Sequence, residues 1–338
     1  MRVEVVVHRG PIAESRHHVE FAAVTSDGRL TDGTANAGLV TTFRSAAKPF
    51  QLLPLVERGH AARFGFSDEE LAIMASSHTG SAYHVEKVRG ILARIGLEER
   101  HLGCGYHEPL DAASRAAIAA GAPQGPIWNN CSGKHSGMLA LSLGEGWPVE
   151  GYLDPTHPAQ VLIRRTVAEC CGVEPAAVLM AVDGCSAPVF GLPLAAMARG
   201  YAMLAVARNG RDARSRALDL IGRSMAAFPI AVAGEGRLST VLMQAGRGQL
   251  IAKGGAEGLE CAAVPGSGLG VALKCEDGQM RAVGPALITV LDRLGALDAE
   301  ALRALESHRR PVVRNHAGLE VGRLETVVHT TAAALTDG

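Results

Sequence analysis

The sequence predicts an α/β protein of the α+β sandwich type. An antiparallel sheet is built from both chain termini, flanked by helices, and joined to a helical lobe. Strand-like runs lie near both ends of the 338-residue chain, helical periodicity dominates the middle, and repeats and low-complexity linkers are absent from the sequence. We therefore expect one domain over 1–338 with two lobes: a sheet lobe from about 1–45 and 245–338, and a helix-rich region over about 46–244.

The strand predictions come from short apolar runs bounded by turn residues. The runs "VEVVV" (3–7) and "VEFAAVT" (19–25) are strand-like, and "SDGR" (26–29) is typical of a turn. Similar runs near the other end predict neighbouring strands at 249–253, 259–265 and 270–283, the last with a turn at 276–278.

The middle of the chain carries helix signals. Ser67 followed by Glu70 is a capping box at the start of one helix, and apolar residues over 85–95 form one stripe of another. Further helices are expected near 111–120, 133–143, 157–171, 189–198, 213–227 and 284–295.

The composition disfavours several classes of protein. A formal net charge of −1 and an aromatic content of 4% argue against binding to nucleic acid or to an anionic membrane. No stretch approaches the roughly 20 apolar residues that span a bilayer. The N-terminal segment lacks the pattern of a signal peptide, and seven cysteines, an odd number, argue against a disulfide framework. We expect a cytoplasmic protein, with a homodimer as the default assembly.

Five short segments concentrate small, polar and reactive residues at the ends of predicted elements: 44–49, 75–81, 129–138, 182–188 and 251–258. In the first of them, Ser45 and Lys48 are three positions apart and share one face of a helix. A lysine whose pKa is lowered by burial or nearby cations can take the proton of a serine hydroxyl, and a helix N-terminus suits a developing oxyanion. A solvated helix start is the alternative interpretation.

Other polar residues have two interpretations each. Ser77 and His78 follow a predicted helix, where the serine could bind substrate, relay a proton or attack, or where both could satisfy free carbonyls. Lys253 ends a predicted strand beside glycines, and it could reach into a cleft or protect a sheet edge. Arg237, in "GEGRLST", could bind one end of a small zwitterion or cap a helix.

Two of the segments contain candidate metal ligands. Cys131, Lys134 and His135 share a helical face, while Asp183 and Cys185 follow an apolar strand. Two cysteines, an aspartate and either a histidine or a neutral lysine would make a four-coordinate zinc site. The spacing differs from a zinc-finger CxxC pair, and two unpaired core thiols are the alternative.

In combination the segments resemble the asparaginase II family, the rhizobial type of L-asparaginase. The resemblance rests on motifs that occur in the family's order: "RG.IAES.H" (9–17), "RSAAKP" (44–49), "ASSHTG" (75–80), "NNCSGKHSGML" (129–139), "GYLDPTHPAQ" (151–160), "DGCSAP" (183–188) and "GEGR" (234–237). The pairing of "CSGKH" with a later "DGC" is the most distinctive of these.

The resemblance implies a fold like that of serine β-lactamases and glutaminases, and hydrolysis of L-asparagine to L-aspartate and ammonia. It implies serine–lysine catalysis by Ser45 with Lys48 and by Ser77 with Lys253, and a site-organising Zn²⁺ on Cys131, Lys134, Asp183 and Cys185. We add Arg44, His78, His135 and Arg237 as expected substrate contacts. The Lys-Thr-Gly strand motif of β-lactamases is missing, since Lys274 lies in "LKCEDG" instead, and this argues against penicillin recognition.

Several alternatives stay open at this point. The two serine–lysine pairs could exchange roles, and glutamine, one methylene longer than asparagine, differs by only about 1–3 kcal/mol in binding. A zinc hydrolase using metal-bound water is a second hypothesis. A non-catalytic amino-acid-binding protein on the same scaffold is a third, and an assay for ammonia release separates it from the enzymes.

Overall fold

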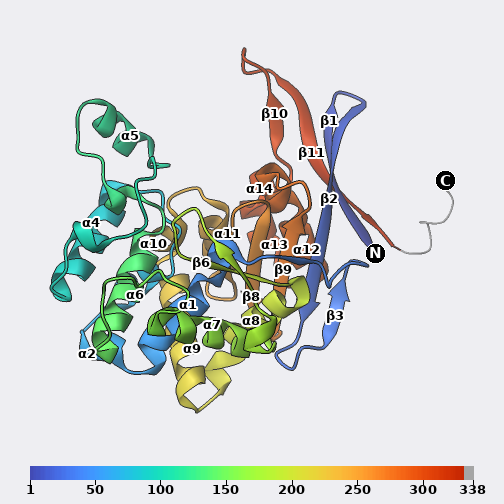
Figure 1. Ribbon diagram of the computed structural model, residues 1–338. Helices are drawn as coiled ribbons and strands as arrows, with labels where there is room; N and C mark the ends of the chain where they lie inside the picture. The colour runs from blue at the N-terminus through green and yellow to red at the C-terminus, as the bar shows by residue number, and fades with distance from the viewer. Residues whose placement is uncertain (331–338) are drawn as a thin grey trace.

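The computed structural model describes residues 1–330, and within them the main sheet is antiparallel throughout. Its strand order is β10-β11-β1-β2-β9-β8-β7, with β3 also paired to β2 (Figure 1). The strands are β1 (Arg2–Arg9), β2 (Ile12–Val24), β3 (Leu30–Gly33), β7 (Ile251–Gly254), β8 (Leu259–Val264), β9 (Leu269–Cys275), β10 (Val312–Arg314) and β11 (Glu320–His329). The predicted fold class, with a sheet from both ends of the chain, is confirmed.

Strand β1 joins the two ends of the chain. It pairs with β11 on one side, with Arg2 opposite His329, and with β2 on the other, with Val3 opposite Val19. Side chains on both faces of β1 are buried, including Val5 and Val6. β-Branched residues pack well in such a central strand, which explains the run of valines.

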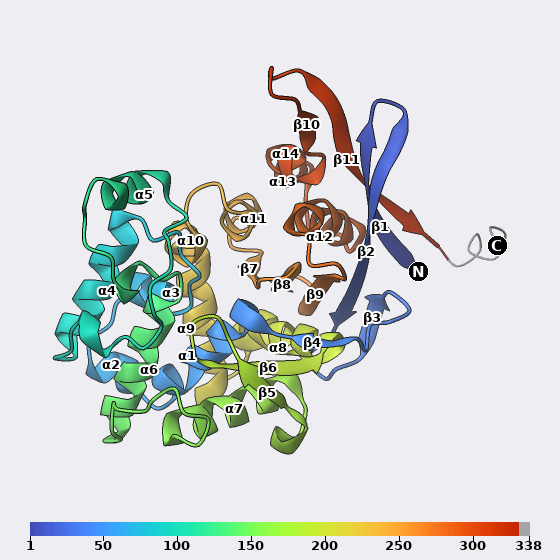
Figure 2. The ribbon, with the colours of Figure 1, turned by 45° about the horizontal axis from the view of Figure 1, so that its top comes forward.

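Helices cover both faces of the sheet. Helix α8 (Leu194–Val206) packs on β2, β8 and β9, while α12 (Val283–Arg293) packs on β1, β8, β9 and β11 from the other side (Figure 2). A Cβ atom at Gly270 of β9 would lie 1.9 Å from the carbonyl oxygen of Ala198, so only glycine allows α8 to approach this closely.

The helical lobe fills the middle of the chain, and α1 lies against α6, α7 and α9 within it. The capping box at α3 is confirmed, because Ser67 Oγ accepts from the Glu70 amide at 3.2 Å and Glu70 accepts from the Ser67 amide at 2.8 Å. The remaining helices are α1 (Lys48–Glu57), α2 (His60–Arg63), α3 (Asp68–Met74), α4 (Ala82–Arg94), α5 (Ala112–Ala119), α6 (Ser132–Glu145), α7 (Pro158–Cys171), α9 (Ala213–Ala227), α10 (Pro229–Ala233), α11 (Leu238–Gly246), α13 (Ala299–Ala304) and α14 (Glu306–Arg309), of which α11 packs on β7.

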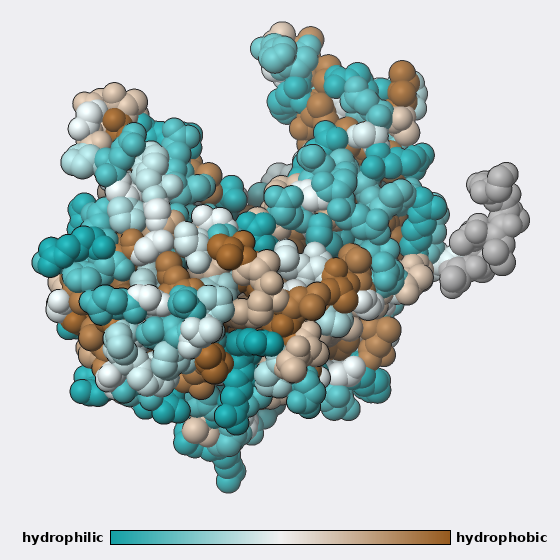
Figure 3. Space-filling view, viewed as in Figure 1, coloured by the Kyte–Doolittle hydropathy of each residue, from teal (hydrophilic) through white to brown (hydrophobic). Residues whose placement is uncertain are grey.

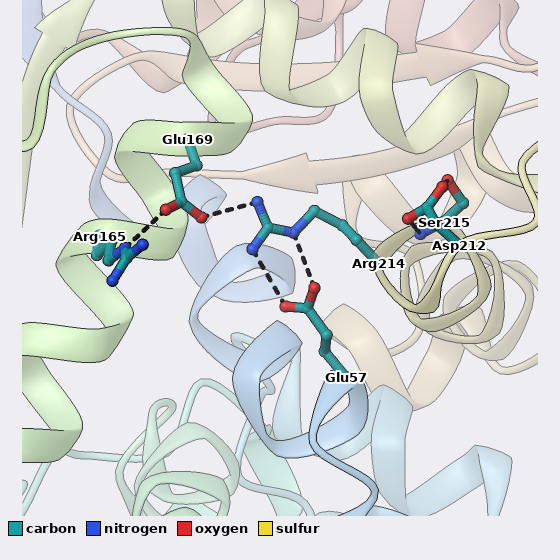
Figure 4. Close-up of polar contacts among 6 residues, drawn as sticks. All are labelled: Glu57, Arg165, Glu169, Asp212, Arg214 and Ser215. Atoms are coloured by element: carbon teal, nitrogen blue, oxygen red, sulfur yellow. Dashed lines mark hydrogen bonds and ion pairs between the residues drawn. The ribbon is translucent and has the colours of Figure 1, made fainter.

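An arginine ties three of these helices together (Figure 4). Arg214 of α9 donates to both carboxylate oxygens of Glu57, the last residue of α1, at 3.0 and 3.3 Å. It also contacts Glu169 of α7 at 2.8 Å, and Glu169 accepts a further bond from Arg165. The contact fixes the end of α1 opposite to the end that carries Lys48.

Two sequence predictions need correction. The helix expected over 189–198 starts only at Leu194, because Pro188–Pro193 forms strand β6 of a second, three-stranded sheet with β4 (Val40–Thr42) and β5 (Leu179–Val182). The buried β-forming residues of this stretch favour the strand. The strand expected over 270–283 ends at Cys275, and Met280–Ala282 forms a 3-10 turn that leads into α12.

Strands β10 and β11 had no sequence prediction, since few of their residues are buried. Within residues 1–330, no helix combines the length and apolar character needed to cross a membrane.

Candidate active site

A cavity of about 540 Å³ collects residues from all five polar segments of the sequence. Arg44 and Ser45 come from the turn before α1, Ser77 from the loop after α3, Cys131 from the start of α6, and Lys253 from β7. Figure 3 shows that the molecular surface is hollowed between the α5 end of the helical lobe and the β10–β11 end of the sheet. Polar residues far apart in the chain therefore share one pocket.

The Ser77 hydroxyl lies between two lysine amines. Lys48 Nζ is 2.8 Å from Ser77 Oγ and 2.5 Å from the carbonyl oxygen of Ser76. Lys253 Nζ is also 2.8 Å from Ser77 Oγ and donates to the carbonyl of Gly254 at 2.7 Å. Both lysines are almost completely buried, with 1% and 2% of their surface exposed.

Ser45 lies in the same cavity, but its hydroxyl group has different surroundings from that of Ser77. Among the residues that the structure describes, its hydroxyl makes no side-chain hydrogen bond. The sequence argument pairs Lys48 with Ser45, whereas the structure hydrogen-bonds Lys48 to Ser77. The pair of Ser77 with Lys253 is in contact.

The backbone next to Ser45 is strained. Arg44 has φ of 44°, in the left-handed region that a non-glycine residue rarely adopts, and such outliers often occur at functional sites. The Arg44 Nε donates to Asp183 Oδ1 at 2.9 Å, which holds this conformation. Arg44 is the first residue of the 3-10 turn Arg44–Ala47, which leads directly into α1.

The two amines are poised to lose their protons. Burial and, next, the charge of the nearby Lys48 together lower the pKa of Lys253 to about 7. Burial also lowers the pKa of Lys48, with the Lys134 charge acting in the same direction. A neutral amine can accept a proton from a hydroxyl, so the surroundings favour base chemistry at Ser77.

A second cluster pairs thiols with a lysine. Lys134 Nζ donates to Cys185 Sγ at 2.9 Å, and a hydrogen bond from Cys185 holds the pKa of the Cys131 thiol well below its usual range. Burial lowers the pKa of Lys134, but the effect of the Cys131 and Cys185 thiols is larger, so the pKa of the amine is raised overall. All seven cysteines are buried and free of disulfides.

This second cluster has donor atoms suited to zinc, because sulfur and nitrogen are the ligands that Zn²⁺ prefers. Cys131, Lys134 and Cys185 are together, whereas the Asp183 carboxylate is bound to Arg44. Elsewhere in residues 1–330, ligand atoms of His17, Cys275 and Asp277 lie within 4.8 Å of one another.

That distant group has a different physical explanation. Arg281 Nε donates to His17 Nε2 at 2.9 Å, which leaves the ring proton on Nδ1, 2.6 Å from Asp277 Oδ2. Both ring nitrogens are then used, so the histidine anchors the turn after β9 rather than offering a free ligand atom.

The two expected histidine contacts lie outside the lining of the cavity. His78 bonds Ser132 Oγ at 3.0 Å and accepts from the Gly80 amide at 3.1 Å, while His135 bonds the Tyr152 hydroxyl at 2.7 Å. Arg237, by contrast, lines the cavity and is exposed.

Sequence reasoning missed Glu260 and His107. Glu260 of β8 lines the cavity with only 2% of its surface exposed, and it accepts from Ser239 Oγ at 2.6 Å. A glutamate inside the apolar run "LECAAV" was the available signal. His107 also lines the cavity, and its Nδ1 is buried without a hydrogen-bond partner in the described part of the chain.

The fold and the cavity together define an α+β protein with a polar pocket for a small molecule. The model of the L-asparaginase II family matches residues 5–326, and the chain belongs to that family. This supports an asparaginase-type amidohydrolase acting on a small molecule, as the resemblance in the sequence implied.

Comparisons with individual proteins add little to the family match. No curated protein matches the chain. A β-lactamase from Mycobacterium bovis is similar with 12% identity and a TM-score of 0.42, covering 81% of this chain and 94% of its own. The protein Mglu, in its Tris and glutamate form, has 15% identity and a TM-score of 0.35, covering 86% of this chain and 62% of its own. These values are too low to support a conclusion about activity.

Proposed function

We propose that the protein hydrolyses L-asparagine to L-aspartate and ammonia through a seryl acyl-enzyme. One observation carries the proposal: the Ser77 hydroxyl lies 2.8 Å from each of two buried lysine amines in a cavity of small-molecule size. An amine with its pKa lowered to about 7, as for Lys253, can act as a general base near neutral pH.

In the first step a serine oxygen bonds to the side-chain amide carbon of asparagine while its proton passes to a lysine amine. The tetrahedral intermediate collapses as that proton is delivered to the amide nitrogen, which leaves as ammonia. Water then attacks the ester, and the serine regains its proton as L-aspartate is released. The serine proton leaves with ammonia and a proton from the attacking water replaces it, so the lysines end each cycle unchanged.

Either serine can be the nucleophile, and a different observation favours each. Ser77 is bonded to both amines, so direct attack by Ser77 is the simplest mechanism. Ser45 has a hydroxyl without other side-chain bonds among the described residues and follows the strained Arg44. If Ser45 attacks, Ser77 relays its proton to the amines.

The test is ammonia release from L-asparagine by the purified protein, followed by S45A and S77A variants. We expect both variants to lose turnover. Acid quenching of the wild type during turnover, with mass spectrometry of its peptides, identifies the serine that carries the aspartyl group. Binding of asparagine without ammonia release by the wild type would instead favour a non-catalytic amino-acid-binding protein.

We also propose that Cys131, Lys134, Asp183 and Cys185 hold Zn²⁺. The soft sulfur atoms support this, whereas Lys134 would have to release its proton and Asp183 would have to exchange its bond to Arg44 for the metal. A bound zinc ion would supply positive charge that orders the loops around Lys134 and His135. Metal analysis of wild type and C185S checks the proposal: we expect zinc in the first and its loss in the second. Full activity of a protein shown to be free of zinc would exclude a zinc hydrolase.

A further inference from the structure

Glu260 is a buried carboxylate that lacks a cationic partner. Only 2% of its surface is exposed, and no lysine, arginine or histidine nitrogen among the described residues lies within ion-pairing distance, 4.0 Å, of it. Ser239 is the one described side chain that hydrogen-bonds it, at Oε1. Buried charges are normally paired, so an unpaired carboxylate facing a cavity indicates a missing ligand.

The local structure holds this carboxylate at the cavity. Glu260 lies opposite Gly254 on the edge strand β7, and a Cβ atom at position 254 would be 2.6 Å from Glu260 Oε2. The carboxylate therefore occupies the space that a side chain at 254 would fill. Ser239 Oγ, which donates to Glu260, also accepts from the Gly254 amide at 3.0 Å, so both strands and α11 fix its position.

The charges around Glu260 match an amino-acid headgroup. The charge of Lys253 acts on the Glu260 carboxyl from beyond ion-pairing distance, and so, more weakly, does that of Arg237, which lines the same cavity two residues before Ser239. An α-amino acid carries its ammonium and carboxylate on one carbon, so its receptor needs an anion and a cation as neighbours. Asp183, the other partly buried carboxylate of the cavity, is already paired with Arg44.

We propose that Glu260 accepts the α-ammonium group of the substrate, with Arg237 facing the α-carboxylate, and that it restricts the enzyme to amides of free α-amino acids. This rests on the proposed function of the same pocket. The ammonium supplies the countercharge that Glu260 lacks, while the side-chain amide extends toward Ser45 and Ser77. Amides without the ammonium leave Glu260 buried and unpaired, which penalises their binding.

The test compares L-aspartate, the product, with succinate, which differs by the absence of the ammonium group. Isothermal titration calorimetry at about pH 8, above the Glu260 pKa of about 7, measures both dissociation constants without any need for turnover. We expect wild type to prefer aspartate by roughly 10- to 100-fold, as for a hydrogen bond to a charged group. In E260Q, which keeps the shape of the side chain, the preference should fall to within about threefold of unity.

Matched variants make the result specific. Glu257 is an exposed carboxylate that lines the same cavity, so E257Q should keep the wild-type preference. If E260Q does not fold, G254A decides instead, because its Cβ displaces the carboxylate and should remove the preference in the same way.

The outcomes separate this inference from the proposed function. Preference for aspartate that persists in E260Q, or wild type that binds the two ligands equally or not at all, overturns the role of Glu260. Wild type that prefers aspartate through Glu260 yet releases no ammonia from L-asparagine overturns the asparaginase proposal and leaves the ammonium site standing.

Discussion

Lys134 and Lys253 are buried to a similar degree in neighbouring clusters, with 4% and 2% of their surface exposed. Their surroundings nevertheless shift the pKa values of the two amines in opposite directions. Around Lys134 the thiols of Cys131 and Cys185 raise the pKa of the amine against the effect of burial. Around Lys253 burial and the Lys48 charge lower the pKa to about 7. The pKa values of two similarly buried amines are thus shifted in opposite directions.

The difference shows that burial alone does not determine the role of a lysine in this protein. Desolvation disfavours the charged form in both clusters, and the sign of the neighbouring charge decides the outcome. The Cys131 thiol, whose pKa is lowered, stabilises the Lys134 ammonium, while the Lys48 amine destabilises the Lys253 ammonium. The predictions below test whether Lys253 takes part in catalysis and whether Lys134 contributes to stability.

The largest expected effect is loss of turnover in K253M. Removing the amine that contacts Ser77 should reduce kcat/KM for ammonia release by about 10²–10⁴-fold, the usual contribution of a general acid or base. The fold should survive, because methionine fills the space without a buried charge. Circular dichroism and thermal unfolding check this, and a well-folded K253M with normal turnover would remove Lys253 from the mechanism.

The opposite result is expected for K134M. Without the amine, Cys185 loses a hydrogen-bond donor and the acidic Cys131 thiol loses one of the two lysine charges that act on it. The free energy of unfolding should therefore fall by about 3 kcal/mol. Urea titration of variant and wild type measures the change. If K134M were as stable as wild type, the structural role of this amine would be wrong.

The pH profile tests the Lys253 amine directly. Because its pKa is lowered to about 7, kcat/KM should rise about tenfold per pH unit below pH 7 and level off above it. The groups that act on this amine are Lys48, Glu260, Cys131 and Arg237.

The same pKa predicts a slope in stability. Between about 7 and the ordinary value of 10.5, the unfolded chain holds the Lys253 proton and the folded protein does not. The free energy of unfolding should therefore rise with pH in this window through this group. Urea titrations at several pH values should show a smaller rise in K253M than in wild type; equal slopes would contradict the lowered pKa.

The smallest expected effect lies outside both clusters. R214M removes the bonds from α9 to Glu57 and Glu169, and it should cost about 1 kcal/mol of stability, as for a partly exposed ion pair. Turnover should stay within about twofold of wild type, because Lys48 lies at the other end of α1. A large loss of activity would mean that the position of α1 depends on this contact.

Much of the fold could be predicted from local patterns. The capping box at Ser67, the valines of β1 and the periodicity of the long helices are local signals, and the structure confirms each of them. The helix predicted at 189–193 was wrong because a short buried apolar run is compatible with either a strand or a helix. Pairing with β4 and β5 makes this segment a strand.

The candidate site was predictable in its membership but less so in its contacts. Polar motifs at element ends indicated the five segments that meet in the cavity. Spacing along the helix suggested that Lys48 faces Ser45, yet the lysine extends across to the next segment and bonds Ser77. The sequence marks Glu260 only as a glutamate inside an apolar run, and its packing against Gly254 of the neighbouring strand is a contact that no local pattern encodes.

The pairing of β1 with β11 has a consequence for biosynthesis. Residues 2–9 are synthesised well before their hydrogen-bond partners at 322–329. Until residues 322–329 are made, the valine-rich strand β1 has only β2 to pair with, and exposed edges of this kind promote association with other chains. We therefore expect the yield of folded protein to improve when nascent molecules are kept apart until β11 is available, for example by slower expression or added chaperones.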